Sequence, residues 1–302
     1  MNSRYNFVLR KDKEKNDMNI IGHVYTDFQE KFGIPRQSGL VDELTGTVVF
    51  LPEYRQPEAF RGLEDFSHIW ILWEFHKAKR ENWSATVKPP KLGGNKRMGV
   101  FATRSPFRPN NIGLSSVKLT GIEYTDDYGP ILHISGVDLL NGTPVYDIKP
   151  YIPYTDCHPD ATGGFTEHLH TGKLDVIFPP ELLAMIPEAK RPALIGILAE
   201  DPRPGYQHDP DRRYGVAFAG FDVRFHINGN VLTVCEVVAV CYPNDNRQGQ
   251  RIYIFIPQNT FVLFSRSGTR LTAYAVHQGP TFEQVCFIKY ISSAPVSYLF
   301  IY

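Results

Sequence analysis

The sequence contains little cysteine, the residue that forms the disulfides of small secreted domains and binds structural zinc. The chain has 302 residues but only four cysteines, at positions 157, 235, 241 and 286, and no two of them have CxxC spacing. This pattern excludes a zinc ribbon or a disulfide framework and indicates reduced thiols. Cys157 and His158 precede His168 and His170, but this spacing matches no usual zinc pattern, and we predict no metal site.

Long apolar runs and an excess of charge of one sign are also absent. No segment approaches a run of about 18 apolar residues, the length that a membrane-spanning helix needs. The N-terminal segment mixes basic and acidic side chains without an apolar stretch, so we expect no signal peptide and predict a cytoplasmic protein. Lysine and arginine total 32, as do aspartate and glutamate, so nucleic-acid binding would have to rest on a local patch.

Several motifs of common enzyme folds are missing. No GxGxxG follows a predicted strand, which argues against a doubly wound dinucleotide-binding fold. Gly93 and Gly94 are not part of a GxxxxGK[ST] phosphate-binding loop, and no GxSxG nucleophile motif occurs.

Many short β-like segments indicate a mainly β fold. Strands are predicted over 47–51, 66–75, 98–103, 116–122 and 131–137, and the turn residues between them favour a barrel or a sandwich. The run 66–75 is apolar almost throughout, which is typical of a fully buried strand. We assign residues 18–165 to this first domain.

A small α+β domain is predicted over residues 175–240. A helical pattern covers 179–199 with Pro187 interrupting it, and Asn228-Gly229-Asn230 between two alternating runs predicts a hairpin. Residues 241–302 contain only seven charged residues and remain an unassigned tail. Two interpretations of this tail are left open: a strand-forming extension or an aggregation-prone segment.

One stretch of the first domain is strongly basic. From 76 to 118 the sequence has ten lysines and arginines against one acid, with Trp83, Phe101 and Phe107 interleaved. This composition suits a phosphate backbone with bases stacked nearby, although a solvated charged face is the alternative. The prolines and glycines of 88–95 predict a loop, which favours binding. The candidate nucleic-acid contacts are Lys88, Lys91, Lys96, Arg97 and Arg108.

Two acids flank a turn that follows a predicted strand. Asp138 and Asp147 lie on either side of the sequence LLNGTP. A carboxylate at such a place can accept a hydrogen bond or a proton from a reacting N–H group. Turn formation alone is the alternative, because Asp, Asn and Gly all favour turns. Both acids are candidates for a catalytic role.

Several ordered segments resemble the TrmO family of S-adenosylmethionine-dependent tRNA adenosine N6-methyltransferases. The resemblance covers about residues 19–160, and a weaker one covers DPRPGY (201–206) and the segment 213–225. The matching blocks are EKFGIPRQSGL (30–40), RGLEDFSHIWIL (61–72), PPKLGGN (89–95), MGVFATRSPFRPN (98–110), IGLS (112–115) and DLLNGTPVYDIKPY (138–151).

The resemblance implies a compact β-barrel methyltransferase that works as a homodimer with S-adenosylmethionine bound near the subunit interface. The implied substrate is the threonylcarbamoylated adenosine next to the anticodon of threonine tRNA, methylated on N6. The basic residues named above would then contact tRNA. The implied cofactor-binding residues are Pro35, Arg36, Gln37, His76, Lys77, Arg104, Leu114, Asp138, Leu139, Leu140 and Asn141.

Two positions depart from the family pattern. Lys77 stands where glutamine is common, and Asn141 stands where aspartate is common, although an amide can still form hydrogen bonds there. Two other functions therefore stay open: a catalytically silent barrel that binds RNA or a nucleotide, and a methyltransferase of the same fold with another substrate.

Overall fold

The chain divides into two compact units. The computed structural model describes residues 18–78, 82–89, 92, 96–167, 172–203, 207 and 209–240, together with the backbone of four strands between 252 and 288. The first unit comprises residues 1–26, 35–170 and 204–206, and the second comprises 27–34, 171–203 and 207–302.

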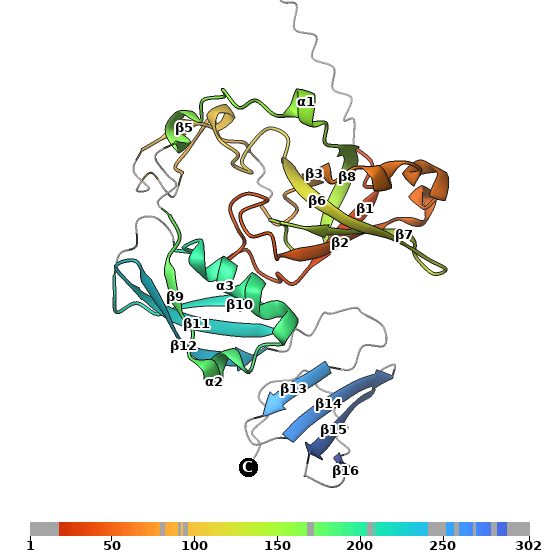
Figure 1. Cartoon of the computed structure of the whole chain (residues 1–302), viewed down its shortest axis with the longest axis vertical. Coiled ribbons are helices and arrows are strands. Elements are labelled where there is room, and N and C mark those ends of the chain that lie inside the picture. Colours follow the sequence, from red (N-terminus) through yellow and green to blue (C-terminus); the bar gives the residue numbers. More distant parts are fainter. Residues whose placement is uncertain are drawn as a thin grey trace, which may run out of the picture. The chain divides into compact units, whose positions relative to one another are not determined.

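The first unit is built on a closed antiparallel barrel with the strand order β1-β2-β7-β6-β3-β8 (Figure 1). This barrel confirms the expected mainly β fold. Its strands are β1 (Gly22–Thr26), β2 (Thr45–Phe50), β3 (His68–Glu74), β6 (Ile112–Thr125), β7 (Gly129–Ser135) and β8 (Thr143–Pro150). The short helices of this unit are η1 (Pro52–Tyr54), η2 (Pro57–Phe60), η3 (Leu63–Asp65), η5 (Val100–Ala102), α1 (Pro153–Asp156) and η6 (Gly164–Thr166).

Alternating apolar residues form the barrel core, because successive side chains of a strand point to opposite faces. Ile69 and Ile71 of β3 are fully buried, as are Val48 of β2 and Leu132 of β7. The prediction that the whole run 66–75 is buried was wrong. Every second side chain of β3 lies on the outer face, where the indole of Trp70 finds a hydrogen-bond partner in the Asp156 carboxylate at 2.9 Å.

The predicted strand over 98–103 is shorter than expected. Only β5 (Met98–Gly99) is extended, and it pairs with β4 (Thr86–Val87) in a two-stranded ribbon. The chain then turns through η5, and both the backbone N–H and the hydroxyl of Thr103 donate to the Val100 carbonyl. The Thr103 bonds cap the η5 turn, a local structure that competes with continued strand pairing.

The second unit contains a four-stranded sheet with the order β10-β11-β12-β9, and α3 packs on one face of it (Figure 1). Pro187 separates α2 (Pro180–Leu183) from η7 (Glu188–Lys190) and α3 (Arg191–Ala199), as predicted. The predicted hairpin at Gly229 is confirmed, because this residue has a φ of 58° in the turn between two strands. The strands are β9 (Asp175–Ile177), β10 (Tyr214–Phe218), β11 (Phe221–Asn228) and β12 (Val231–Ala239).

A segment from the β1–β2 connection, residues 27–34, is part of the second unit. Phe28 has no exposed surface and packs against Phe218, with ring centroids 5.3 Å apart. The Ala219 N–H donates to the Asp27 carbonyl at 3.1 Å, and the Asp27 carboxylate forms an ion pair with Lys190. The chain therefore leaves the first unit after Thr26 and returns to it at Pro35.

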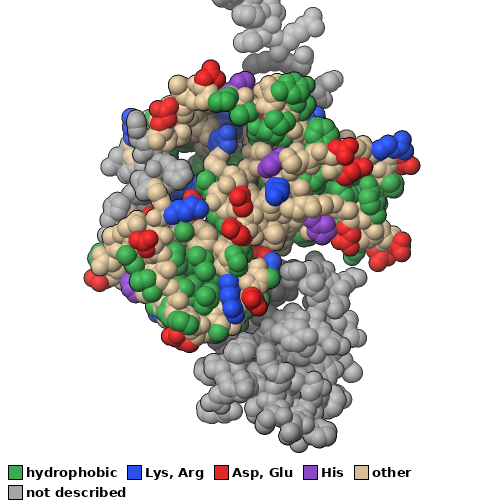
Figure 2. All heavy atoms as spheres, in the orientation of Figure 1, with side chains coloured by type: hydrophobic (Ala, Val, Ile, Leu, Met, Phe, Trp, Pro, Cys, Tyr) green, Lys and Arg blue, Asp and Glu red, His purple; other side chains and the backbone are tan. Residues whose placement is uncertain are grey.

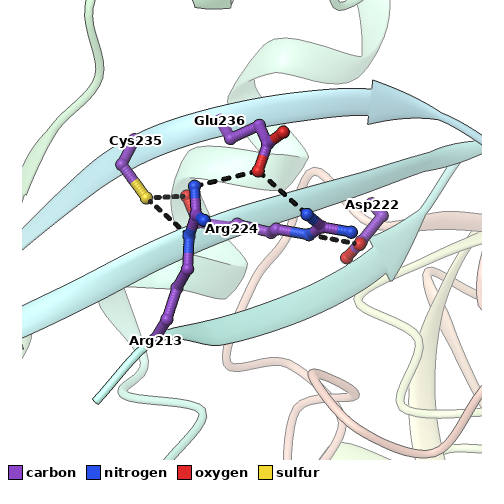
Figure 3. Close-up of polar contacts among 5 residues, drawn as sticks. All are labelled: Arg213, Asp222, Arg224, Cys235 and Glu236. Atoms are coloured by element: carbon purple, nitrogen blue, oxygen red, sulfur yellow. Dashed lines mark hydrogen bonds and ion pairs between the residues drawn. The ribbon is translucent and has the colours of Figure 1, made fainter.

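The sheet of the second unit also carries a charged network on β11, on β12 and just before β10 (Figure 3). Arg213 and Arg224 both donate to the Glu236 carboxylate, at 2.8 and 2.9 Å, and Arg224 also binds Asp222 at 2.9 Å. Cys235 lies beside these guanidinium groups. Opposite charges balance within this network, so it offers no net positive surface for RNA.

Four further strands form an antiparallel sheet with the order β13-β14-β15-β16. They are β13 (Ile252–Ile256), β14 (Thr260–Ser267), β15 (Arg270–Gln278) and β16 (Glu283–Ile288). The tail that the sequence left unassigned therefore includes strands.

Candidate functional site

The connection between β7 and β8 holds the candidate residues 138–141, and hydrogen bonds fix it at several points. Thr26 at the end of β1 makes two of them: its hydroxyl donates to the Leu139 carbonyl at 2.9 Å, and its N–H donates to Asn141 Oδ1 at 3.1 Å. The Gly142 N–H donates to the Val24 carbonyl at 2.8 Å. The Asn141 side-chain oxygen thus accepts a hydrogen bond that holds the loop to β1, and the oxygen of an aspartate could also accept it.

Asp138 is the most strongly perturbed acid of the barrel. The Trp73 indole N–H donates to Ser115 Oγ at 2.9 Å, and the Ser115 hydroxyl donates to Asp138 Oδ1 at 2.7 Å. Burial raises the pKa of Asp138 from the usual 3.8 to about 6, and hydrogen bonds from Ser115 and from the Ser38 backbone oppose this rise, as does the charge of Arg104. The carboxylate is therefore mostly ionised at neutral pH but poorly solvated, a state that favours a further hydrogen bond or a cation.

Gly113 makes this network possible. It lies opposite Trp73 in the β3–β6 register, and the indole ring covers it. A Cβ at position 113 would lie 2.3 Å from the ring, so any larger residue would displace Trp73. The sequence analysis did not single out Trp73 or Ser115. Ser115 lies within a matching block and Trp73 directly follows another, but only the barrel register shows that the two side chains meet near Asp138.

Two loops bring further candidate residues toward Asp138. The Arg104 guanidinium donates to the Gln37 side-chain oxygen, and the Gln37 amide donates to the Arg36 carbonyl. Arg104 is exposed, and its charge acts on Asp138. Residues 36–38, Arg104 and Asp138 are far apart in the sequence, yet the barrel brings them to one place.

The remaining cofactor-binding candidates differ in what they expose. The side chains of Pro35, Leu139 and Leu140 are buried, so they pack in the protein and only their backbone could meet a ligand. Leu114 is 50% exposed although it neighbours the buried Ser115. Because successive side chains of a strand point to opposite faces, Leu114 lies on the outer face of β6, opposite the side on which Ser115 binds Asp138.

His76 and Lys77 follow β3 at the edge where β6 begins. The β3–β6 pairing ends at Glu74 and Ile112, and the Phe75 N–H then donates to the Asn111 carbonyl at 2.9 Å. His76 is half-buried and Lys77 is exposed. The structure places both at the end of the strand that carries Trp73.

Asp147, the other catalytic candidate, has different surroundings. Its carboxylate forms an ion pair with Lys149 at 2.9 Å and accepts a hydrogen bond from the Ile148 N–H at 2.9 Å. Its side chain is 45% exposed. A solvated and already paired carboxylate has less reason to bind a substrate than Asp138 does.

The candidate RNA contacts are of two kinds. Lys88, Lys96 and Arg97 are exposed, whereas Arg108 is half-buried and donates to two carbonyls of the η5 turn, at 3.0 and 2.6 Å. Lys91 lies outside the described residues. On the face drawn in Figure 2, acidic and basic side chains are interspersed, so any positive surface for RNA is a local one.

The described residues contain neither a candidate metal site nor a membrane-spanning helix. Within the described ranges, no group of three or more His, Cys, Asp or Glu is placed to hold a metal ion. His168 and His170, the sequence neighbours of Cys157, lie outside those ranges. No helix in the described part of the chain has the length and apolar character to span a membrane.

Comparisons with known proteins give one consistent family. Residues 23–157 match the family model of the tRNA-methyltransferase O N-terminal domain, and residues 171–240 match that of the TrmO C-terminal domain. A tRNA (adenine(37)-N6)-methyltransferase of Escherichia coli K12 is 42% identical over 217 residues, which is 68% of this chain and 91% of that protein.

Two other relatives agree. A Pseudomonas aeruginosa protein, described as a candidate S-adenosylmethionine-dependent methyltransferase, is 43% identical over 223 residues, covering 68% of this chain and 90% of the relative. A crystal structure of TrmO from Pseudomonas aeruginosa matches with a TM-score of 0.60 and 36% identity, covering 74% of this chain and 98% of that one. The barrel, the matched domains and these relatives together establish that the chain is an enzyme of the tRNA-methyltransferase O family.

Proposed function

We propose that this protein transfers the methyl group of S-adenosylmethionine to N6 of adenosine 37 in tRNA, and that its substrate is the threonylcarbamoylated adenosine of threonine tRNA. Family membership supports the reaction type. The observation that locates the site is the desolvated carboxylate of Asp138. It accepts a hydrogen bond from Ser115, and the positive charge of Arg104 acts on it.

The side chains around Asp138 fit S-adenosylmethionine. Arg104 and the amide of Gln37 suit a carboxylate, and the ionised Asp138 suits an ammonium, a sulfonium or a hydroxyl group. Leu114, on the outer face of β6, offers a separate exposed apolar surface for an adenine ring. When bound, the cofactor supplies an activated methyl group on a positively charged sulfur. His76 and Lys77 complete the proposed pocket from the end of β3.

The protein's task in methyl transfer is mainly alignment, because the leaving group is already activated. The N6 nitrogen of adenine is a weak nucleophile, and a hydrogen-bond acceptor on its N–H relieves the charge that develops as the new bond forms. Asp138 is better suited than Asp147 to accept that hydrogen bond, because its carboxylate is desolvated and Asp147 is paired with Lys149. If Asp138 instead binds the cofactor, Asp138→Asn raises the KM for S-adenosylmethionine; if it accepts the N6 hydrogen bond, kcat falls.

The exposed cations of the β4–β5 region are the proposed contacts with the tRNA backbone. They are Lys88, Lys96 and Arg97, together with Lys91 of the same segment. Arg108 acts differently in this proposal, because its Nη1 group donates to two carbonyls of the η5 turn. It supports the surface instead of neutralising a phosphate.

The deciding experiment is transfer of labelled methyl groups to threonine tRNA, with and without the prior threonylcarbamoyl modification. Transfer to the modified tRNA alone supports both reaction and substrate. Cofactor binding without transfer to either tRNA favours a methyltransferase with another substrate. RNA binding without cofactor binding favours the catalytically silent barrel.

The family resemblance also supports a cytoplasmic homodimer with the cofactor near the subunit interface. Sedimentation of the full chain tests this directly. A monomer that transfers methyl groups at its full rate would refute the dimeric site.

A further inference from the structure

An exposed pair of aromatic rings lies beside the basic segment. Trp83 and Phe101 are 51% and 71% exposed, yet their rings are nearly parallel, with an interplanar angle of 26° and centroids 6.1 Å apart. The Arg108 guanidinium lies over the Phe101 ring, 5.6 Å from its centroid. Large aromatic side chains are rarely left in water as an ordered pair without a partner to cover them.

The backbone around this pair is held in place. The Ser84 N–H donates to the Phe107 carbonyl at 3.3 Å, and the Val100 N–H donates to the Ala85 carbonyl at 2.9 Å. These bonds and the β4–β5 ribbon join the segment that carries Trp83 to the one that carries Phe101. The two rings are therefore presented on a preorganised support, which lowers the entropy cost of binding a ligand to them.

The chain segments that carry the pair have charge of one sign. From Asn82 to Ile122 the sequence contains no aspartate or glutamate, while Lys88, Lys96 and Arg97 are exposed. Arg97 donates to the Thr86 hydroxyl of β4 at 2.7 Å, which places its cation on the ribbon itself. Parallel aromatic rings bordered by cations suit an anionic polymer with unpaired bases. A double helix offers no free base faces to such rings, whereas a single-stranded loop does.

We propose that the Trp83–Phe101 pair is a stacking platform for an unpaired base in the loop of the substrate RNA. This inference rests on the proposed tRNA function and adds to it the residues that select loop over duplex. The exposed cations hold the backbone on either side, and Arg108 positions Phe101 by cation–π contact and by its bonds to the η5 turn. Affinity thus has a stacking part, insensitive to salt, and a phosphate part that depends on salt.

The test is RNA binding by the full-length protein, with an unmodified anticodon stem-loop as the probe. Trp83→Ala and Phe101→Ala are each expected to weaken binding about 5- to 100-fold, the range expected for the loss of one stacked base. The slope of log K against log salt should not change. Lys88→Ala should reduce that slope by about 0.7, because it removes one phosphate contact. Tyr124→Ala is the matched control, since Tyr124 is 57% exposed near the tip of the β6–β7 hairpin.

Fluorescence gives an independent readout. Stacking of a base on Trp83 should quench its emission when RNA binds, and Trp83→Phe should remove this quenching while keeping affinity within about 3-fold, because a ring is retained. Affinity and quenching that are unchanged in Trp83→Ala and in Phe101→Ala would overturn the platform. The proposed function is tested separately, because it fails if the wild-type protein does not methylate tRNA, whatever the effect of the ring variants on binding.

Discussion

Asp138→Asn should remove a pH-dependent loss of barrel stability and should impair methyl transfer. The carboxyl group titrates near 3.8 in the unfolded chain and at about 6 in the folded protein, because burial disfavours its charged form. Between these values the folded state holds a proton that the unfolded state has released. The free energy of unfolding therefore falls as pH rises from about 4 to about 6, and the loss remains at higher pH.

The size of this effect follows from the shift in pKa. A rise from 3.8 to about 6 corresponds to roughly 3 kcal/mol, which is an upper value because the carboxyl is only partly withdrawn from solvent. Asparagine does not titrate, so the variant lacks this loss. The stability difference between variant and wild type should thus grow by up to about 3 kcal/mol between about pH 4 and pH 7. Any constant offset from changed hydrogen bonds to Ser115 and Ser38 does not alter this growth.

Urea denaturation followed by tryptophan fluorescence measures this difference for the barrel alone. The three tryptophans, Trp70, Trp73 and Trp83, all belong to the first unit, so the signal reports that unit. Titration of all other groups is common to both proteins and cancels in the difference. A stability difference that stays constant from about pH 4 to pH 7, or one that shrinks as pH rises, would refute the burial of an ionised Asp138.

Three further predictions concern the support of the site, the RNA surface and the core of the second unit. Gly113→Ala places a methyl group 2.3 Å from the Trp73 ring. We expect it to lower the free energy of unfolding of the barrel by roughly 1–3 kcal/mol in the same urea assay, and to raise the KM for the cofactor. Unchanged values would show that the indole moves aside freely. Replacing Lys88, Lys91 and Arg97 together by alanine should weaken tRNA binding and lower the salt slope by about 2, with no change in cofactor affinity by calorimetry; equal tRNA affinity would argue for a different substrate. Phe28→Ala removes a fully buried ring and should lower the free energy of unfolding by about 3–5 kcal/mol, measured by circular dichroism in urea. A loss below about 1 kcal/mol would contradict the role of Phe28 in the core.

Local pattern and composition determined the elements of this protein. Local β-type patterns predicted the barrel strands β2, β3, β6 and β7 but not β1 and β8. Asn228 and Gly229 predicted the hairpin, and Pro187 predicted the break between the helices, because each signal acts within a few residues of the chain. The ordered blocks from 30 to 151 also indicated the family, which the matches confirm. The site residues of these blocks could be named from the sequence, but their individual roles could not.

Only the tertiary structure decided what each of those residues does. The side-chain hydrogen bonds of the site join residues that are distant in the sequence: Asp138 and Ser115 are 23 residues apart, Ser115 and Trp73 are 42 apart, and Arg104 and Gln37 are 67 apart. Burial, and with it the raised pKa of Asp138, arises from such non-local neighbours, as does the difference between Asp138 and Asp147. The same holds for the segment 27–34, whose Phe28 joins the core of the second unit. Periodicity shows which face of an element is buried, but desolvation and pairing depend on the residues that the fold brings from elsewhere.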